Sequence, residues 1–396
     1  MIKILGVTLL GLVFALPSIA QEKTDEWFNH YRENTSKALS QALQQNIGKD
    51  VRFEEGVKAL KEKNYDAAFK PLLESAEDGH PPAQLLIARM YFTGKGVIKD
   101  IKQAMMWYNL AAEQHYPEAE IDLGIMYIVG QQIPKDPVKG YQWFQKAADQ
   151  GNAEGQFFVA ACYFDGIGVA KNRKKAADFL ELAAQQGSTI SQYYLAGMYL
   201  QGDGPKKDLA KSFRWMKAAA DSDYLPAIND LGVYYSRGTG TPKDEHKAYE
   251  LYNYAAGLGD SAAMYNAGYL LIKGRGVKQN TTTGMKWLEI SAKDNVPCAS
   301  LDLGILYADG KLIAASPGTA HQWFEKALTT AIQHQEFKIK VPFDPTDNVK
   351  LSAFSKQFAD FMLKQTQPEK SETKIDENTE KIMHDFMQQF ENICWQ

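Results

Sequence analysis

The chain of 396 residues has 45% hydrophobic and 23% charged side chains, a composition typical of a globular protein with a sizeable core. Its formal net charge of −4 argues against a nucleic-acid partner, which would require a basic face. Its three cysteines are too few for a disulfide framework.

Residues 1–20 have the features of a secretory signal peptide. Lys3 supplies a positive charge, residues 4–16 form an apolar stretch, and Ser18 and Ala20 are small residues at a cleavage site. The alternative is a retained membrane anchor, but the apolar stretch is shorter than the roughly 20 residues that span a bilayer. We therefore expect cleavage after Ala20, no membrane insertion afterwards, and a periplasmic or secreted protein of bacterial type.

Two segments precede the regular part of the chain. Residues 21–50 are expected to be helical and belong to no repeat. Residues 51–80 read as a divergent helical hairpin without a glycine turn, which we expect to cap the N-terminal end of the array.

A period of 36 residues runs through the centre of the chain. It is set by a column of large side chains: Tyr91, Tyr127, Tyr163, Tyr199, Tyr235, Leu271 and Tyr307. Three residues after each member comes a glycine: Gly94, Gly130, Gly166, Gly202, Gly238, Gly274 and Gly310. Three residues before each member the side chain is small: Ala88, Gly124, Ala160, Ala196, Gly232, Gly268 and Gly304. A fixed period of this length predicts a solenoid.

The chemistry of these positions predicts two helices per repeat. The glycine suits a left-handed C-terminal cap, and the small residue lets a neighbouring helix approach closely. A residue able to cap the next helix follows each turn: Asp100, Asp136, Asn172, Asp208, Asp244, Asn280 and Ser316. The second helix is expected to bury a bulky column: Trp107, Trp143, Phe179, Trp215, Leu251, Trp287 and Trp323.

This pattern resembles the Sel-1-like repeat family, relatives of tetratricopeptide repeats, in strings such as AEIDLGIMYIVG, WFQKAADQG and LGVYYSRGTGTPKD. The resemblance covers seven repeats over residues 81–328. It implies an all-α fold, a right-handed α/α superhelical solenoid of helical hairpins. It also implies a role in binding other proteins.

Residues 329–396 lie beyond the repeats and read as a helical extension with a polar linker near 366–376. An amphipathic final helix presents Ile382, Met383, Phe386, Met387, Phe390 and Ile393. We favour a cap over the open end of the solenoid, with a partner-binding helix as the alternative.

Residues typical of catalysis or metal binding do not converge in the sequence. The paired glycines of the turns end helices, so they indicate caps rather than phosphate-binding loops. The seven histidines are scattered, and no nucleophile motif is present, so we expect no cofactor, no metal site and no enzyme. Cys162 and Cys298 lie four repeats apart and are expected to be buried thiols, whereas Cys394 could pair only if the tail folds back.

Variable positions of the first helices are the candidate binding residues. We expect an aromatic patch of Phe157, Phe158, Tyr193 and Tyr194 on the concave face, although packing against the next hairpin is an open alternative for these rings. Acidic Asp122 and Asp230 are expected near its flanks, as is Asp302.

The expected function is therefore a scaffold or adaptor in the bacterial cell envelope that binds another protein in its groove. An alternative is an exported immunity or inhibitor protein that clamps a toxin or a cell-wall enzyme. A β-lactam-hydrolysing enzyme is a weaker alternative, because relatives linked to β-lactams carry two cysteines per repeat and this chain does not.

Overall fold

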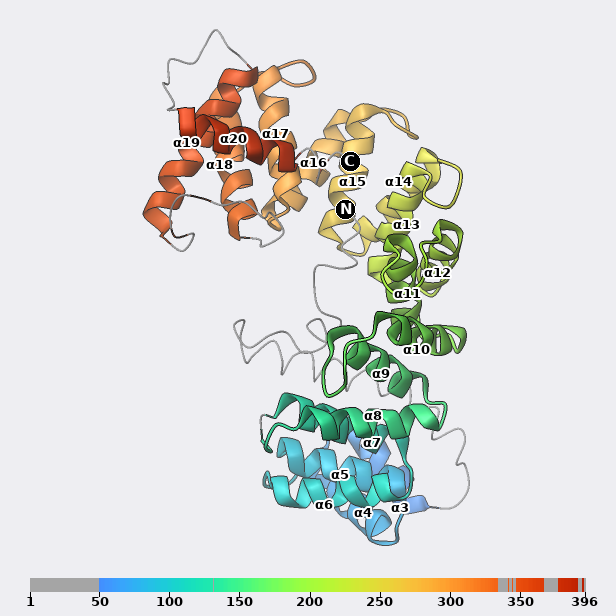
Figure 1. Ribbon diagram of the computed structural model, residues 1–396. Helices are drawn as coiled ribbons and strands as arrows, with labels where there is room; N and C mark the ends of the chain where they lie inside the picture. Colours follow the sequence, from blue (N-terminus) through green and yellow to red (C-terminus); the bar gives the residue numbers. More distant parts are fainter. Residues whose placement is uncertain are drawn as a thin grey trace. The chain divides into compact units, whose positions relative to one another are not determined.

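The computed structural model describes residues 50–130, 132–333, 341, 344, 347–366, 377–390 and 394. The predicted signal peptide, the segment 21–49 and residues 367–376 of the predicted linker lie outside the described residues. Every regular element in the described part of the chain is a helix (Figure 1). The predicted all-α solenoid of helical hairpins is thus confirmed.

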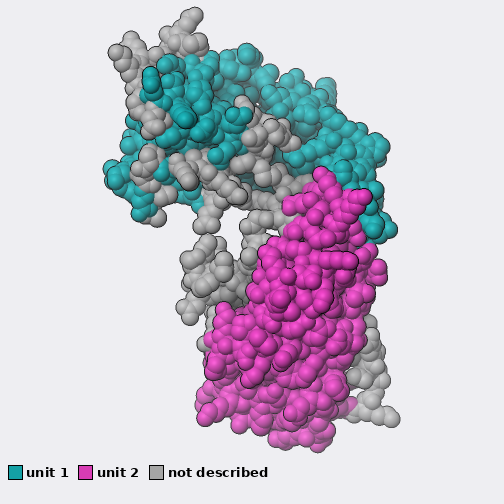
Figure 2. Space-filling model, in the orientation of Figure 1, with its two compact units in different colours: residues 1–6, 208–396 teal, residues 7–207 magenta. Residues whose placement is uncertain are grey.

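The chain divides into two compact units, residues 7–207 and residues 1–6 with 208–396 (Figure 2). The described helices of the first are α3 (Val51–Lys61), α4 (Tyr65–Glu77), α5 (Pro81–Thr93), α6 (Ile101–Glu113), α7 (Pro117–Val129), α8 (Pro137–Asp149), α9 (Ala153–Asp165), α10 (Arg173–Gln185) and α11 (Thr189–Gln201). Those of the second are α12 (Leu209–Asp221), α13 (Leu225–Arg237), α14 (Glu245–Gly257), α15 (Ser261–Lys273), α16 (Thr281–Lys293), α17 (Pro297–Asp309), α18 (Pro317–Gln333), α19 (Asn348–Thr366) and α20 (Glu377–Phe390).

The ends of the helices are fixed by the residues that the repeat pattern singles out. Gly94 ends α5 in the left-handed conformation at φ 73°, and its amide donates to the Met90 carbonyl. Asp100 then begins α6, because its carboxylate accepts from the backbone amides of Lys102 and Gln103. Equivalent glycine caps and side-chain caps recur along the repeats, which confirms the predicted helix boundaries.

The second glycine of each paired-glycine turn lies against the preceding hairpin. A Cβ at Gly168, where φ is +69°, would lie 2.0 Å from the carbonyl oxygen of Pro137 at the start of α8. Gly96, Gly204, Gly240 and Gly276 make the same close approach to the preceding second helix. The backbone of the preceding hairpin therefore occupies the space that a bound phosphate would need. These turns hold neighbouring hairpins together and are not phosphate-binding loops.

The most deeply buried column of the second helices differs from the predicted one. Trp143 is only half-buried, whereas the next residue, Phe144, is fully buried and contacts the position where Gly124 lacks a side chain. The buried column therefore lies one residue after the predicted column: Tyr108, Phe144, Leu180, Met216, Tyr252, Leu288 and Phe324. The predicted column was wrong as a core column because its side chains lie at the rim of the hairpin interface, where only Trp107 and Trp215 are buried.

The last two described helices continue the core of the last repeats. Met383, Phe386 and Phe390 of α20 are fully buried and share one cluster with Phe358 of α19 and Phe324 of α18. The apolar face of α20 thus packs inside the unit, as expected of a cap; Ile393 lies outside the described residues.

Candidate functional site

The predicted aromatic patch is buried. Phe158 of α9 is 1% exposed, and its ring stacks on Phe144 of α8 at a centroid distance of 4.6 Å. Phe157 lies 6.2 Å from Tyr194 of α11, and Tyr194 lies 5.6 Å from Tyr193. The four residues do come together, but as one packed cluster, so the expectation of an exposed patch was wrong. The reason is that the ring contacts of Phe157 and Phe158 hold neighbouring helices together.

Two of the three predicted acidic flanks, Asp122 and Asp230, are also buried. Asp122 of α7 forms an ion pair with Arg89 of α5, with 2.7 Å between Oδ2 and Nε. Asp230 of α13 is 4% exposed and accepts a hydrogen bond from the Asn229 amide at 3.4 Å. Asp122 therefore ties consecutive first helices together, and neither carboxylate provides an exposed acidic flank.

A partly exposed set of first-helix residues lies further along the chain. Asn266, Tyr269 and Lys273 follow one another at spacings of three and four on α15, and so share one helix face. Asp302 and Ile305 occupy the corresponding positions of α17. We call these five residues the α15–α17 face. Sequence reasoning named Asp302 as an acidic flank but favoured the more aromatic repeats, so it missed Asn266, Tyr269, Lys273 and Ile305.

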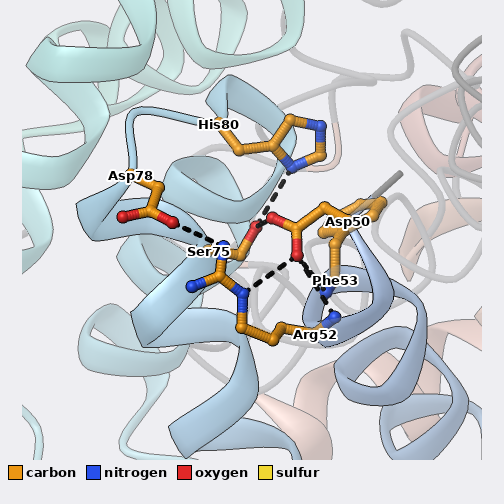
Figure 3. A network of polar contacts seen from close by, with 6 residues as sticks. All are labelled: Asp50, Arg52, Phe53, Ser75, Asp78 and His80. Atoms are coloured by element: carbon orange, nitrogen blue, oxygen red, sulfur yellow. Dashed lines mark hydrogen bonds and ion pairs between the residues drawn. The ribbon is translucent and has the colours of Figure 1, made fainter. Parts of the chain in front are cut away.

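A serine, a histidine and an aspartate meet at the first hairpin (Figure 3). Ser75 donates to Asp50 at 2.6 Å and lies 3.3 Å from Nδ1 of His80. In a catalytic triad the imidazole lies between the hydroxyl and the carboxylate, whereas here the hydroxyl lies between the other two. Ser75 is also fully buried. The arrangement does not activate Ser75 as a nucleophile.

The same cluster instead fastens the two helices of the hairpin together. Asp50 caps α3 through the amides of Arg52 and Phe53, and Arg52 pairs with Asp78 at the end of α4. Burial opposes ionisation of Asp50, but hydrogen bonds from Ser75, Arg52 and Phe53 outweigh it and lower the pKa of that carboxyl. Burial lowers the pKa of His80, against the attraction of Asp50. Both shifts favour an ionised Asp50 beside a neutral His80. A negative charge at this position is stabilised by the N-terminus of α3.

The cysteines depart from the expectation for Cys298. Cys298 of α17 is bonded to Cys394, with 5.5 Å between their Cα atoms, so the tail does fold back. Cys162 is free and buried, as expected, and burial raises the pKa of its thiol. No group of three or more His, Cys, Asp or Glu side chains in the described segments could hold a metal ion.

Comparisons with known proteins identify the family. The Sel1 repeat model matches residues 81–116, 117–152, 153–188, 189–224, 225–260, 261–296 and 299–329. A protective antigen of uropathogenic Escherichia coli that displays an SLR fold is 26% identical; the match has a TM-score of 0.67 and covers 88% of this chain and 78% of that one. A Sel1 repeat protein from Oxalobacter formigenes is 30% identical, with a TM-score of 0.53, over 62% of this chain and 97% of that one.

The comparison with curated protein sequences found no match. Within the described segments, no helix combines the length and the apolar character needed to cross a membrane. The seven matched segments cover well over half of the chain, and the chain belongs to the Sel1 repeat family.

Proposed function

We propose that this chain is a non-catalytic scaffold of the bacterial cell envelope, and that it binds another protein through the α15–α17 face. The observation that carries this proposal is the mixed chemistry of that face. It combines an aromatic ring, an aliphatic side chain, an amide and both signs of charge on two first helices at equivalent repeat positions. Such mixtures are typical of protein interfaces, in which aromatic anchors lie among polar groups.

The contacts around Tyr269 support its role as an anchor. Its ring lies 6.3 Å from that of Tyr265, and the ammonium of Lys273 lies 5.8 Å from its centroid. The hydroxyl of Tyr265 donates to the Cys394 carbonyl, so the disulfide-bonded tail holds this part of α15. A ring held by its neighbours loses little side-chain entropy when a partner binds it.

The disulfide supports a location outside the cytoplasm. Disulfides persist in oxidising compartments such as the periplasm and are rare in the cytosol. Together with the predicted signal peptide, Cys298–Cys394 favours a periplasmic or secreted protein. A role as an immunity or inhibitor protein stays a prediction, because the identity of the partner decides it.

Site-specific photo-crosslinking tests the proposal. A photoreactive phenylalanine analogue replaces Tyr269 in one version of the protein and Tyr254 in another, both expressed in the native host. Tyr254 is a matched control, since it lies on the second helix α14 of the same unit and is exposed. We expect one defined protein to crosslink from position 269 and not from position 254. No adduct from position 269, or the same adducts from both positions, contradicts the proposal.

A further inference from the structure

Ten lysines lie along one edge of the unit formed by residues 7–207. They occupy the loops after the first helices and the first turns of the second helices: Lys95, Lys99, Lys102, Lys135, Lys139, Lys171, Lys174, Lys175, Lys206 and Lys207. All ten are exposed. We call this set the basic edge. Because the whole chain carries a net charge of −4, the positive charge is concentrated locally.

The loops of the basic edge are adjacent in space. The loop after α9 lies on the start of α8, since Gly168 approaches the carbonyl of Pro137. The loop after α11 lies on the start of α10 in the same way, through Gly204 and Arg173. The loop after α5 lies on the start of α4 through Gly96 and Tyr65. The same contact thus recurs in three of the four loops, and it brings their lysines close to the first turns of the preceding second helices.

Few acidic groups balance this charge. The loops and first turns that hold these lysines contain four carboxylates, and each is engaged by the fold. One of them, Asp208 at the end of the loop after α11, caps α12 through the backbone amide of Lys211. Asp100 accepts from two backbone amides of α6, Asp136 caps α8 and pairs with Lys139 at 3.6 Å, and Asp203 pairs with Arg173 at 3.0 Å. The N-termini of α6, α8 and α10 add partial positive charge at the same edge. The edge therefore presents a strong positive potential.

Exposed aliphatic side chains stand among the lysines. Ile98 is 89% exposed in the loop after α5, and Pro134 and Ala170 occupy the equivalent positions in the next two loops. Val138 is 53% exposed in the first turn of α8. Each of these four residues directly precedes a lysine of the basic edge. Apolar tips alternating with lysines match the interfacial region of a bilayer, where aliphatic groups enter the acyl boundary and lysines reach the headgroups.

We propose that the basic edge attaches the protein peripherally to an anionic lipid surface. The lysine ammonium groups contact headgroup phosphates, and Ile98 and Val138 enter the interface. A soluble acidic polymer without apolar side chains would pair with the lysines but would leave Ile98 in water. This attachment is separate from the α15–α17 face, which belongs to the other unit.

Vesicle co-sedimentation tests the proposal with the protein as purified from its host. One set of vesicles mixes phosphatidylglycerol with phosphatidylcholine, and the other contains phosphatidylcholine alone. We expect binding to the anionic vesicles that weakens as sodium chloride is added, because salt screens the lysines. Reversing three charges, with Lys99→Glu, Lys135→Glu and Lys171→Glu together, should weaken this binding at least about 30-fold.

A matched triple variant controls for net charge. Lys58, Lys70 and Lys146 are exposed on α3, α4 and α8, outside the loops and first turns of the basic edge, and their replacement by glutamate should change binding less than about threefold. Ile98→Asn keeps every charge and should weaken vesicle binding about five- to tenfold. Its binding to soluble polyglutamate should be unchanged. Circular dichroism melts confirm that the variants fold.

Three results would overturn the proposal. Equal binding to both kinds of vesicle would show that anionic lipid is not required. An equal loss of vesicle binding in the two triple variants would show that the basic edge is not the binding surface. Unchanged vesicle binding by Ile98→Asn, with polyglutamate bound as tightly as vesicles, would identify the edge as a site for a soluble acidic partner.

Discussion

Gln150 donates a hydrogen bond of 2.7 Å to one carboxylate oxygen of Glu120, while the other oxygen, Oε1, is buried and has no hydrogen-bond partner among the described residues. In two other repeats the equivalent residue is a glutamine that donates to a backbone carbonyl: Gln84 to Ala76 and Gln192 to Ala184, both at 3.1 Å. A protonated Glu120 could donate to Ala112 in the same way. Burial raises the pKa of Glu120 to about 7, against the attraction of Lys146.

The first prediction is that Glu120 makes stability depend on pH. A carboxyl whose pKa rises on folding contributes stability that is present below its unfolded pKa and is lost as pH rises through its folded pKa. For Glu120 the loss runs from about pH 4.5 to about pH 7. Glu120→Gln should therefore raise the free energy of unfolding by about 1–3 kcal/mol at pH 8 and by much less at pH 4. Urea unfolding at both pH values measures this.

The reverse substitution is its control. Gln156 occupies the same position one repeat later and accepts from Gln186 at 2.9 Å. Gln156→Glu should create a second pH-dependent loss of stability over the same range. If neither variant changes the pH profile, this position does not titrate on folding.

The second prediction separates the two bulky columns of the second helices. Phe144→Ala should lower the free energy of unfolding by about 3–5 kcal/mol, because a fully buried ring is removed from the hairpin and from its stack on Phe158. Trp143→Ala, next to it but half-buried, should cost only about 1–2 kcal/mol. Denaturant melts of the two variants measure both losses of unfolding free energy. Equal losses would mean that both columns contribute equally to the core.

The third prediction concerns two glycines that both have positive φ. Gly187, at φ +88°, has no atom within 4 Å of the point that a Cβ would occupy, so Gly187→Ala should cost about 1–2 kcal/mol of backbone strain alone. Gly168→Ala adds a clash with the Pro137 carbonyl and should cost at least about 2 kcal/mol more. Thermal melts compare the variants, and equal costs would show that the turn can move away from α8.

The fourth prediction concerns the disulfide. Cys394→Ser should lower stability by about 2–4 kcal/mol, because Cys298–Cys394 closes a long loop and holds the tail on α17. A reductant should lower the melting temperature of the wild type and leave that of the Cys298→Ser, Cys394→Ser double variant unchanged. A thiol assay under denaturing conditions should find one free thiol, Cys162, in the unreduced protein. Three free thiols in the freshly isolated protein would contradict the pairing.

The fifth prediction concerns export. N-terminal sequencing of the protein recovered from its native host should begin at Gln21, since the small residues before it form the expected cleavage site. A protein that retains Met1 would show that the leader is not removed.

The repeat, the helix ends and the turns follow from residues that act locally along the chain. A left-handed glycine and a capping carboxylate act on the backbone beside them, so Gly94 and Asp100 have the same consequence in every repeat. Which side chains are buried depends instead on how the helices pack against one another. Trp143 and Phe144 are neighbours on one helix, and the place where α7 crosses α8 determines which of them enters the core.

Dependence on packing between helices also explains why the predictions for the binding site and for Cys298 were wrong. Variation at Phe158 and Asp122 suggested exposure, but each is matched by a partner that also varies, Phe144 and Arg89 respectively. Such matching lies between helices, so no position read alone reveals it. The pairing of Cys394 with Cys298 likewise depended on the path of a tail outside the repeats. The repeat period reflects the local conformation of each backbone segment. The burial of a side chain depends on which residue of the neighbouring helix packs against it.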